Sequence, residues 1–189
     1  RGTGKNKGYE VVVVGGREPD LPLTESGISD IVRASLRENI SLIIDLFSKE
    51  TASKSSWIRI VQKVIEIVLY ENGDTGVHRH IFMEEAHQLI PQVLQKQHNL
   101  IFSEFEKMAL MGRNERLGYT LLSQRAENVN KSITENSELN FVMNQGGKNS
   151  LSSYDKWLKL RNESTREEMM NTLPKLKPGE AWVFGVMED

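Results

Sequence analysis

The stretch HIFMEEAHQLIPQ, residues 80–92, places two adjacent carboxylates, Glu84 and Glu85, directly after an apolar run. The run His80–Met83 has the composition of a short buried strand, so the two acids are expected at the carboxyl end of that strand. In an open parallel sheet, ligands bind at this edge. The pair therefore either holds a metal ion and a water molecule, or is ordinary polar sequence at a strand end, where loops meet solvent.

The composition is that of an ordinary globular protein with no strong charge bias. Of the 189 residues, 38% are hydrophobic and 26% are charged, so we expect a single domain with a sizeable core over residues 1–189. The formal net charge of −2 leaves only local basic patches for contact with nucleic acid. Cysteine is absent, which excludes disulfides and thiolate metal sites and fits a cytoplasmic protein. The longest apolar runs are too short to cross a membrane.

Short apolar runs alternate with helical patterns, which predicts an α/β fold with a largely parallel central sheet flanked by helices. The runs lack polar alternation, which is typical of parallel strands covered on both faces. The predicted strands are Tyr9–Val14, Ser41–Phe47, His80–Met83, Tyr119–Ser123, Asn140–Asn144 and Ala181–Val186. The predicted helices are Gly27–Glu38, Ser56–Glu71, Asn99–Arg113, Asn130–Glu138 and Ser150–Leu173.

A second polar group follows the strand predicted at Tyr119–Ser123. Gln124 and Arg125 come directly after it, and the parallel arrangement brings them to the same sheet edge as Glu84 and Glu85. Nucleotide hydrolases use this combination: one acid holds the Mg²⁺ shell, a second polarises a water molecule, and an amide senses the γ-phosphate. The constellation favours the functional interpretation of the acid pair over the polar strand end.

Several stretches in this order resemble one known family. IFMEEAHQLIP (residues 81–91) and MALMGRNERLGYTLLSQRAENVNKSITENSELNFVMNQ (residues 108–145) resemble the central domain of HerA-type DNA translocase ATPases, in the HerA–FtsK branch of RecA-like P-loop proteins. The closing LPKLKPGEAWVFG (residues 173–185) resembles the last strand of that domain, and YEVVVVGGREPDLPL (residues 9–23) the strand after the P-loop helix. The resemblance covers most of the chain and implies a RecA-like ATPase domain.

The resemblance implies a role for each of the polar residues at the sheet edge. Glu84 matches the family's Walker B aspartate and would act through the Mg²⁺ hydration shell. Glu85 matches the glutamate that orients the attacking water, and Gln124 matches the polar sensor. Arg125, like Glu84, is expected to bind the nucleotide.

An arginine in MGRNERLG matches the position from which the family offers a guanidinium to the nucleotide of the neighbouring subunit. That residue is Arg113, with Arg116 and Arg125 as competitors for the role. A guanidinium suits this task because it is planar, always charged and able to bind phosphate through two donors. The alternative is a solvated arginine at a helix C-terminus, where the helix dipole favours a cation.

The phosphate-binding loop is where the family pattern breaks. A P-loop has the form G-x-x-x-x-G-K-[ST] and leads into a helix. Gly4 and Lys5 of RGTGKNKGYE, residues 1–10, could form the end of such a loop, but Asn6 replaces the hydroxyl residue and no room remains for a helix before Tyr9. Three explanations stay open: a P-loop upstream in a longer protein, residues missing after Lys5, or a degenerate ATPase. We expect a domain that is incomplete at its P-loop end.

Three further features bear on the site. Glu84 stands in place of an aspartate, which adds a methylene next to a metal with strict geometry. Gly15 and Gly16 follow the first strand and are expected to form a simple turn. The spacing Glu84-x-x-His87 occurs in di-metal helical bundles, but such sites need two copies of the motif, so His87 is expected to pack beside Glu85.

The resemblance implies a motor subunit that binds ATP and Mg²⁺. It would hydrolyse ATP at the interfaces of a homo-oligomeric ring, expected to be a hexamer, and move along duplex DNA as a translocase or helicase. A nuclease or an antiviral effector subunit would be its partner. The alternative from another class is a ring-forming scaffold with weak catalysis, which assembles such a partner.

Overall fold

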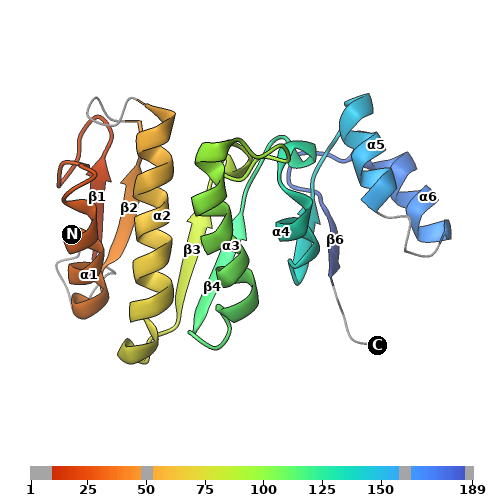
Figure 1. The fold of residues 1–189 in the computed structure, drawn as a ribbon. Helices are drawn as coiled ribbons and strands as arrows, with labels where there is room; N and C mark the ends of the chain where they lie inside the picture. Colours follow the sequence, from red (N-terminus) through yellow and green to blue (C-terminus); the bar gives the residue numbers. More distant parts are fainter. Residues whose placement is uncertain (1–9, 48–52, 158–162, 186–189) are drawn as a thin grey trace, which may run out of the picture. The chain divides into compact units, whose positions relative to one another are not determined.

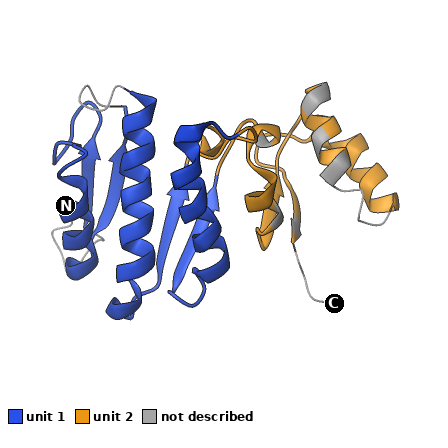
Figure 2. Cartoon of the chain, in the orientation of Figure 1, with its two compact units in different colours: residues 1–83, 94–121 blue, residues 84–93, 122–189 orange. Residues whose placement is uncertain are grey.

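The chain forms two compact units, which are coloured in Figure 2. The computed structural model describes residues 10–47, 53–157 and 163–185. The N-terminal unit comprises residues 1–83 and 94–121, and the C-terminal unit comprises residues 84–93 and 122–189. The single domain expected over residues 1–189 stays a prediction.

The N-terminal unit contains two pairs of parallel strands. The strands β1 (Val11–Gly15) and β2 (Ser41–Asp45) pair with Gly15 opposite Asp45. The strands β3 (Arg79–Met83) and β4 (Leu117–Leu121) pair with Met83 opposite Leu121. In Figure 1 the helices α1 (Ile28–Glu38), α2 (Lys54–Glu71) and α3 (Asn99–Met111) lie along one face of these strands. Short 3₁₀ turns occur at Gly73–Thr75 and Lys96–His98.

The helix α2 illustrates how the sequence builds this unit. Its N-cap residue Ser53 accepts a hydrogen bond from the backbone N–H of Ser56, which satisfies one of the free donors at the helix start. Its apolar side chains recur at helical spacing and become the buried face. They are Ile58, Ile60, Val61, Ile65, Ile67, Val68 and Leu69.

One face of the strands is covered and the other is open. Along β3 burial alternates, so that Met83 is buried while Phe82 is 71% exposed, and Ile43 of β2 is 53% exposed. The sequence predicted that both faces of the strands would be covered. In the described part of this unit that prediction is wrong. The physical reason is that α1, α2 and α3 lie on the same face, which leaves the alternate apolar side chains in solvent.

The C-terminal unit contains an antiparallel strand pair with helices packed on it. The strands β5 (Leu139–Val142) and β6 (Trp182–Gly185) pair with Val142 opposite Trp182. The helices are α4 (Lys131–Glu135), α5 (Lys148–Trp157) and α6 (Glu163–Thr172), with 3₁₀ turns at Ala86–Gln88, Ala126–Asn128 and Leu173–Lys175. The α/β class with parallel strands is confirmed, but the described strands form three separate pairs, of which this one is antiparallel.

The helix predicted over Ser150–Leu173 is wrong as one continuous element. Val142, Tyr154, Met169 and Leu173 share one buried cluster, in which burial raises the pKa of Tyr154 to about 12. Fifteen residues along one helix would hold Tyr154 and Met169 about 22 Å apart. They meet because α5 and α6 are separate helices that pack against each other. An apolar face that recurs at helical spacing does not show where one helix ends and the next begins.

Gly15 ends β1 and Gly16 begins the bend that follows it, where the sequence predicted a turn. Both have positive φ, 81° and 82°. A Cβ on Gly15 would collide with the backbone carbonyl oxygen of Asp45, and one on Gly16 with the Asp45 carboxylate. The turn lets the Gly15 N–H donate to the carbonyl of Leu21 at 3.0 Å. Glycine is required here because the paired strand comes so close.

Replacing Gly15 by alanine is therefore expected to destabilise the protein. The added Cβ combines an unfavourable left-handed backbone with a backbone clash, and we expect the free energy of unfolding to fall by about 1–3 kcal/mol. The measurement is urea denaturation followed by circular dichroism. Gly146→Ala is the matched control, because a Cβ at Gly146 meets no atom within 4 Å. Equal stability of the two variants would contradict the expectation.

His98 predicts how stability depends on pH. Its ring is 1% exposed, and its Nδ1 atom accepts from the Gln95 N–H at 3.2 Å. Burial, and then the nearby charge of Lys54, lower the pKa of His98. The unfolded chain therefore binds this proton more readily, so the free energy of unfolding should fall as the pH drops from about 7 to about 5.

The measurement for His98 is the slope of the free energy of unfolding against pH. Replacing His98 by glutamine should make this slope smaller, because one group that titrates differently in the two states is removed. His78→Gln serves as the control, since His78 is exposed in the same unit. A slope that His98→Gln leaves unchanged would contradict the assignment.

Candidate functional site

The two glutamates follow β3 at once and differ in their surroundings. Glu84 is exposed, and the side chain of Glu85 is 39% exposed. Glu85 has a left-handed backbone, with φ 50° and ψ 42°, and its carbonyl accepts the N–H of Gln88 at 2.8 Å. Residues other than glycine rarely adopt this conformation, and such strain is concentrated at functional sites.

The segment that carries the glutamates is joined to the segment that follows β4. The Ala86 N–H donates to the Leu122 carbonyl at 3.0 Å, and the Gln92 N–H to the Asn128 carbonyl at 2.7 Å. The Asn130 N–H donates back to the Ile90 carbonyl at 3.0 Å. Ala86 and Ile90 are fully buried and anchor the joined segments. Within the C-terminal unit, the residues after the acid pair and those before and after Gln124 thus form one structure.

His87 makes the side-chain link between these two segments. Its Nδ1 atom lies 3.2 Å from Oε2 of Glu85 and 3.1 Å from Oγ of Ser123. Ser123 Oγ also accepts the N–H of Arg125 at 3.1 Å. The expectation that His87 lies beside Glu85 is confirmed. Among the described residues no group of three or more His, Asp or Glu side chains that could hold a metal ion occurs.

The polar residues after β4 lie in a loop and are open to solvent. The strand ends at Leu121 instead of Ser123, so the predicted sensor residue Gln124 is part of the loop. Gln124 and Arg125 are exposed. In the described part of the chain, the side chains of Glu84 and Gln124 make no hydrogen bond or ion pair. Both are therefore available to a ligand.

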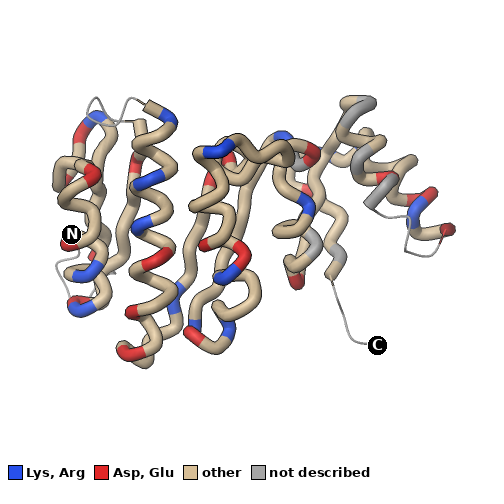
Figure 3. Tube along the Cα trace, viewed as in Figure 1, with Lys and Arg blue, Asp and Glu red and all other residues tan. Residues whose placement is uncertain are grey.

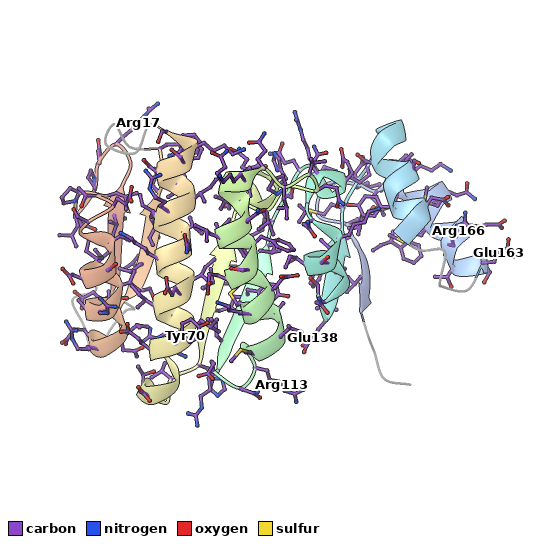
Figure 4. The ribbon with its side chains drawn as sticks, viewed as in Figure 1. Arg17, Tyr70, Arg113, Glu138, Glu163 and Arg166 are labelled. Atoms are coloured by element: carbon purple, nitrogen blue, oxygen red, sulfur yellow. The ribbon has the colours of Figure 1, made fainter. Side chains whose placement is uncertain are left out.

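The arginines of the α3–β4 turn belong to the N-terminal unit. Arg113 is exposed just beyond the end of α3, on the amino-terminal side of β4, as Figure 4 shows. Arg116 has φ 55°, its guanidinium donates to the carbonyl of Gly76, and its own carbonyl accepts the Arg79 N–H at 2.9 Å. These bonds give Arg116 a structural role in the turn, whereas the side chain of Arg113 makes no hydrogen bond or ion pair with the described residues.

The remaining sequence-predicted residues add little to the geometry. Gly4 and Lys5 lie outside the described residues. Figure 3 shows basic and acidic residues interspersed along the helices of the N-terminal unit, without one continuous basic stripe. Among the described residues no helix is long and apolar enough to cross a membrane.

The donor chemistry at the acid pair fits Mg²⁺ that is held mainly by a nucleotide. Mg²⁺ in phosphate-transfer sites keeps several waters and takes one or two carboxylates together with phosphate oxygens. The free, exposed carboxylate of Glu84 can supply one such oxygen, directly or through water. A closed cluster of protein ligands is not required for this type of site.

The backbone of Glu85 gives a test of strain at the site. Glu85→Gly and Glu85→Ala both remove the carboxylate, so their difference reports the backbone alone. Because only glycine adopts a left-handed conformation without penalty, we expect the glycine variant to be the more stable by about 1 kcal/mol. Urea denaturation of both variants measures this. If the alanine variant were as stable as the glycine variant, the left-handed turn would carry no strain.

The comparison with known proteins identifies similar solved structures but no family. No family model matches the sequence, and no curated protein matches it. The genome packaging NTPase B204 from Sulfolobus turreted icosahedral virus 2, in complex with ATP-γS, is 12% identical with a TM-score of 0.58, over 94% of this chain and 78% of that chain. The same NTPase in complex with AMPPCP is 19% identical with a TM-score of 0.53, over 96% and 94%. The chain therefore shares the fold of this NTPase.

Proposed function

We propose that the chain is the ATPase module of a DNA-translocating motor. The observation that carries the proposal is the joining of the two loops after β3 and β4, through the Ala86–Leu122 backbone bond and the His87 contacts. This arrangement keeps an acid pair and a free amide in one compact unit. Two similar structures of an NTPase, in complex with ATP-γS and with AMPPCP, support ATP as the nucleotide.

In this proposal each polar residue of the site in the C-terminal unit has a separate role in ATP hydrolysis. Glu84 would hold Mg²⁺ through its water shell; the ion, when bound, neutralises charge on the β- and γ-phosphates. Glu85 orients and polarises the attacking water with its partly exposed carboxylate. Gln124 contacts the γ-phosphate, and Arg125 contacts the nucleotide. Gly4 and Lys5 would belong to the phosphate cradle.

The proposed assembly rests on Arg113. A guanidinium at the γ-phosphate stabilises the charge of the transition state, and Arg113 is exposed and free to be offered to the nucleotide of a neighbouring subunit. We therefore propose a homo-oligomeric ring, of six subunits, that moves along duplex DNA in the cytoplasm. A nuclease or antiviral effector would act with it.

The second candidate is a ring-forming scaffold with weak catalysis. Glu84 favours it, because the extra methylene relative to aspartate displaces a carboxylate oxygen next to an ion that demands near-ideal octahedral geometry. Asn6 favours it too, because it cannot supply the hydroxyl that a P-loop offers to Mg²⁺. Both candidates form rings, and they differ in how fast they hydrolyse ATP.

The test is the substitution Glu85→Gln in the full-length protein. The amide keeps the shape of the side chain but cannot act as a base, so we expect ATP hydrolysis to fall by at least about 100-fold while nucleotide binding and assembly persist. Phosphate release, binding of a fluorescent ATP analogue and mass measurement give the three readouts. Glu66→Gln is the control, because Glu66 is an exposed residue of α2 in the N-terminal unit.

Two results would count against the proposal. Steady phosphate release by Glu85→Gln would remove Glu85 from the reaction. Absence of ATP hydrolysis by the wild-type protein, with assembly intact, would favour the scaffold.

A further inference from the structure

The Nδ1 atom of His87 has two polar neighbours. It makes a hydrogen bond with Oγ of Ser123 at 3.1 Å, in which either atom could donate, and it lies 3.2 Å from Oε2 of Glu85. A carboxylate oxygen beside this nitrogen is favourable only when the nitrogen carries a proton, and the Ser123 hydroxyl can accept a hydrogen bond from that N–H. The two contacts together favour the Nδ1–H tautomer of the neutral ring.

The contact holds a carboxylate that has no other restraint in the described structure. Among the described residues, His87 is the one side chain that lies within ion-pair distance of the carboxylate of Glu85. The His87 side chain is only 17% exposed, so water competes weakly for its N–H. The second oxygen of Glu85 stays free. The carboxylate is therefore held at one oxygen and open at the other, as a group that orients water must be.

The other end of the contact lies directly before the amide of Gln124. Ser123 Oγ also accepts the N–H of Arg125, so this one oxygen organises the loop on both sides of Gln124. A shift of the loop changes the hydrogen bond between Ser123 and His87. Contact of Gln124 with a ligand would thus alter the restraint on Glu85 through the hydrogen bond between Ser123 and His87 and the contact of His87 with Glu85.

We propose that His87 is a positioning residue that couples the Gln124 loop to the orientation of Glu85. This inference rests on the proposed function, because the reaction that it tunes is ATP hydrolysis. His87 touches neither the nucleotide nor the water. It acts through the carboxylate of Glu85, and its contribution comes from the Nδ1–H alone.

The first experiment compares three substitutions of His87 in the full-length protein. Asparagine places an amide N–H near the position of Nδ1, glutamine places one near Nε2, and alanine places none. We expect His87→Ala to lower kcat for ATP by about 10- to 100-fold with KM changed less than about twofold, as for outer residues that orient a reacting group. His87→Asn should recover kcat to within about threefold of wild type, and His87→Gln should not.

His78→Ala is the control for this experiment. It should leave kcat unchanged, because His78 is an exposed histidine of the N-terminal unit. Equal rescue by asparagine and glutamine, or no loss in His87→Ala, would overturn the proposal. A change in KM alone would overturn it too, because it would place His87 in nucleotide binding instead of positioning.

The second experiment needs no hydrolysis and so separates this inference from the proposed function. Imidazole ¹⁵N chemical shifts of the nucleotide-free protein should show the Nδ1–H tautomer of His87, assigned by the signal that His87→Asn lacks. The double substitution Glu85→Ala and Ser123→Ala should abolish this preference, because it removes both acceptors. An Nε2–H tautomer in the wild type would overturn the proposal, whether or not the protein hydrolyses ATP.

Discussion

The hydrogen bond from Ala86 to the carbonyl of Leu122 is the constraint on which the candidate site depends. Within the C-terminal unit it joins the segment that follows β3 in the sequence to the segment that follows β4. Fully buried Ala86 and Ile90 hold the segment in place, since their exposure would cost apolar burial. The polar residues of the site lie in loops, and this bond fixes those two loops to each other.

The strain at Glu85 follows from the same constraint. To let Ala86 bond to Leu122 and His87 turn toward Ser123, the chain must bend sharply at the residue before them, and Glu85 takes the left-handed conformation. A glycine would adopt that bend more easily, yet it would leave no carboxylate. The protein therefore has a glutamate in a strained backbone conformation. Such strain is typical of functional sites, where the side chain is needed for chemistry although it lowers stability.

The sequence predicts the strands and the position of the acid pair well, because continuous apolar runs and strand-end acids are local features. Sequence-based prediction fails for features that depend on contacts between residues far apart in the sequence. The packing of α5 against α6 brings Tyr154 to Met169, and β5 pairs antiparallel with β6, a partner far away in the sequence. The bond from Arg116 to Gly76 and the hydrogen bond between His87 and Ser123 likewise join segments that no local pattern relates. The sequence predicted that His87 lies beside Glu85 but not which ring nitrogen would face it.

The open face of the strands in the N-terminal unit has a practical consequence for work with this protein. Phe82 and Ile43 stand exposed in the folded state, and dyes such as ANS fluoresce when they meet apolar surface of this kind. A dye-based melting assay would therefore begin from a bright native signal, and the rise on heating would be compressed or inverted. Stability is better followed by backbone ellipticity, which responds to the helices and not to the uncovered side chains.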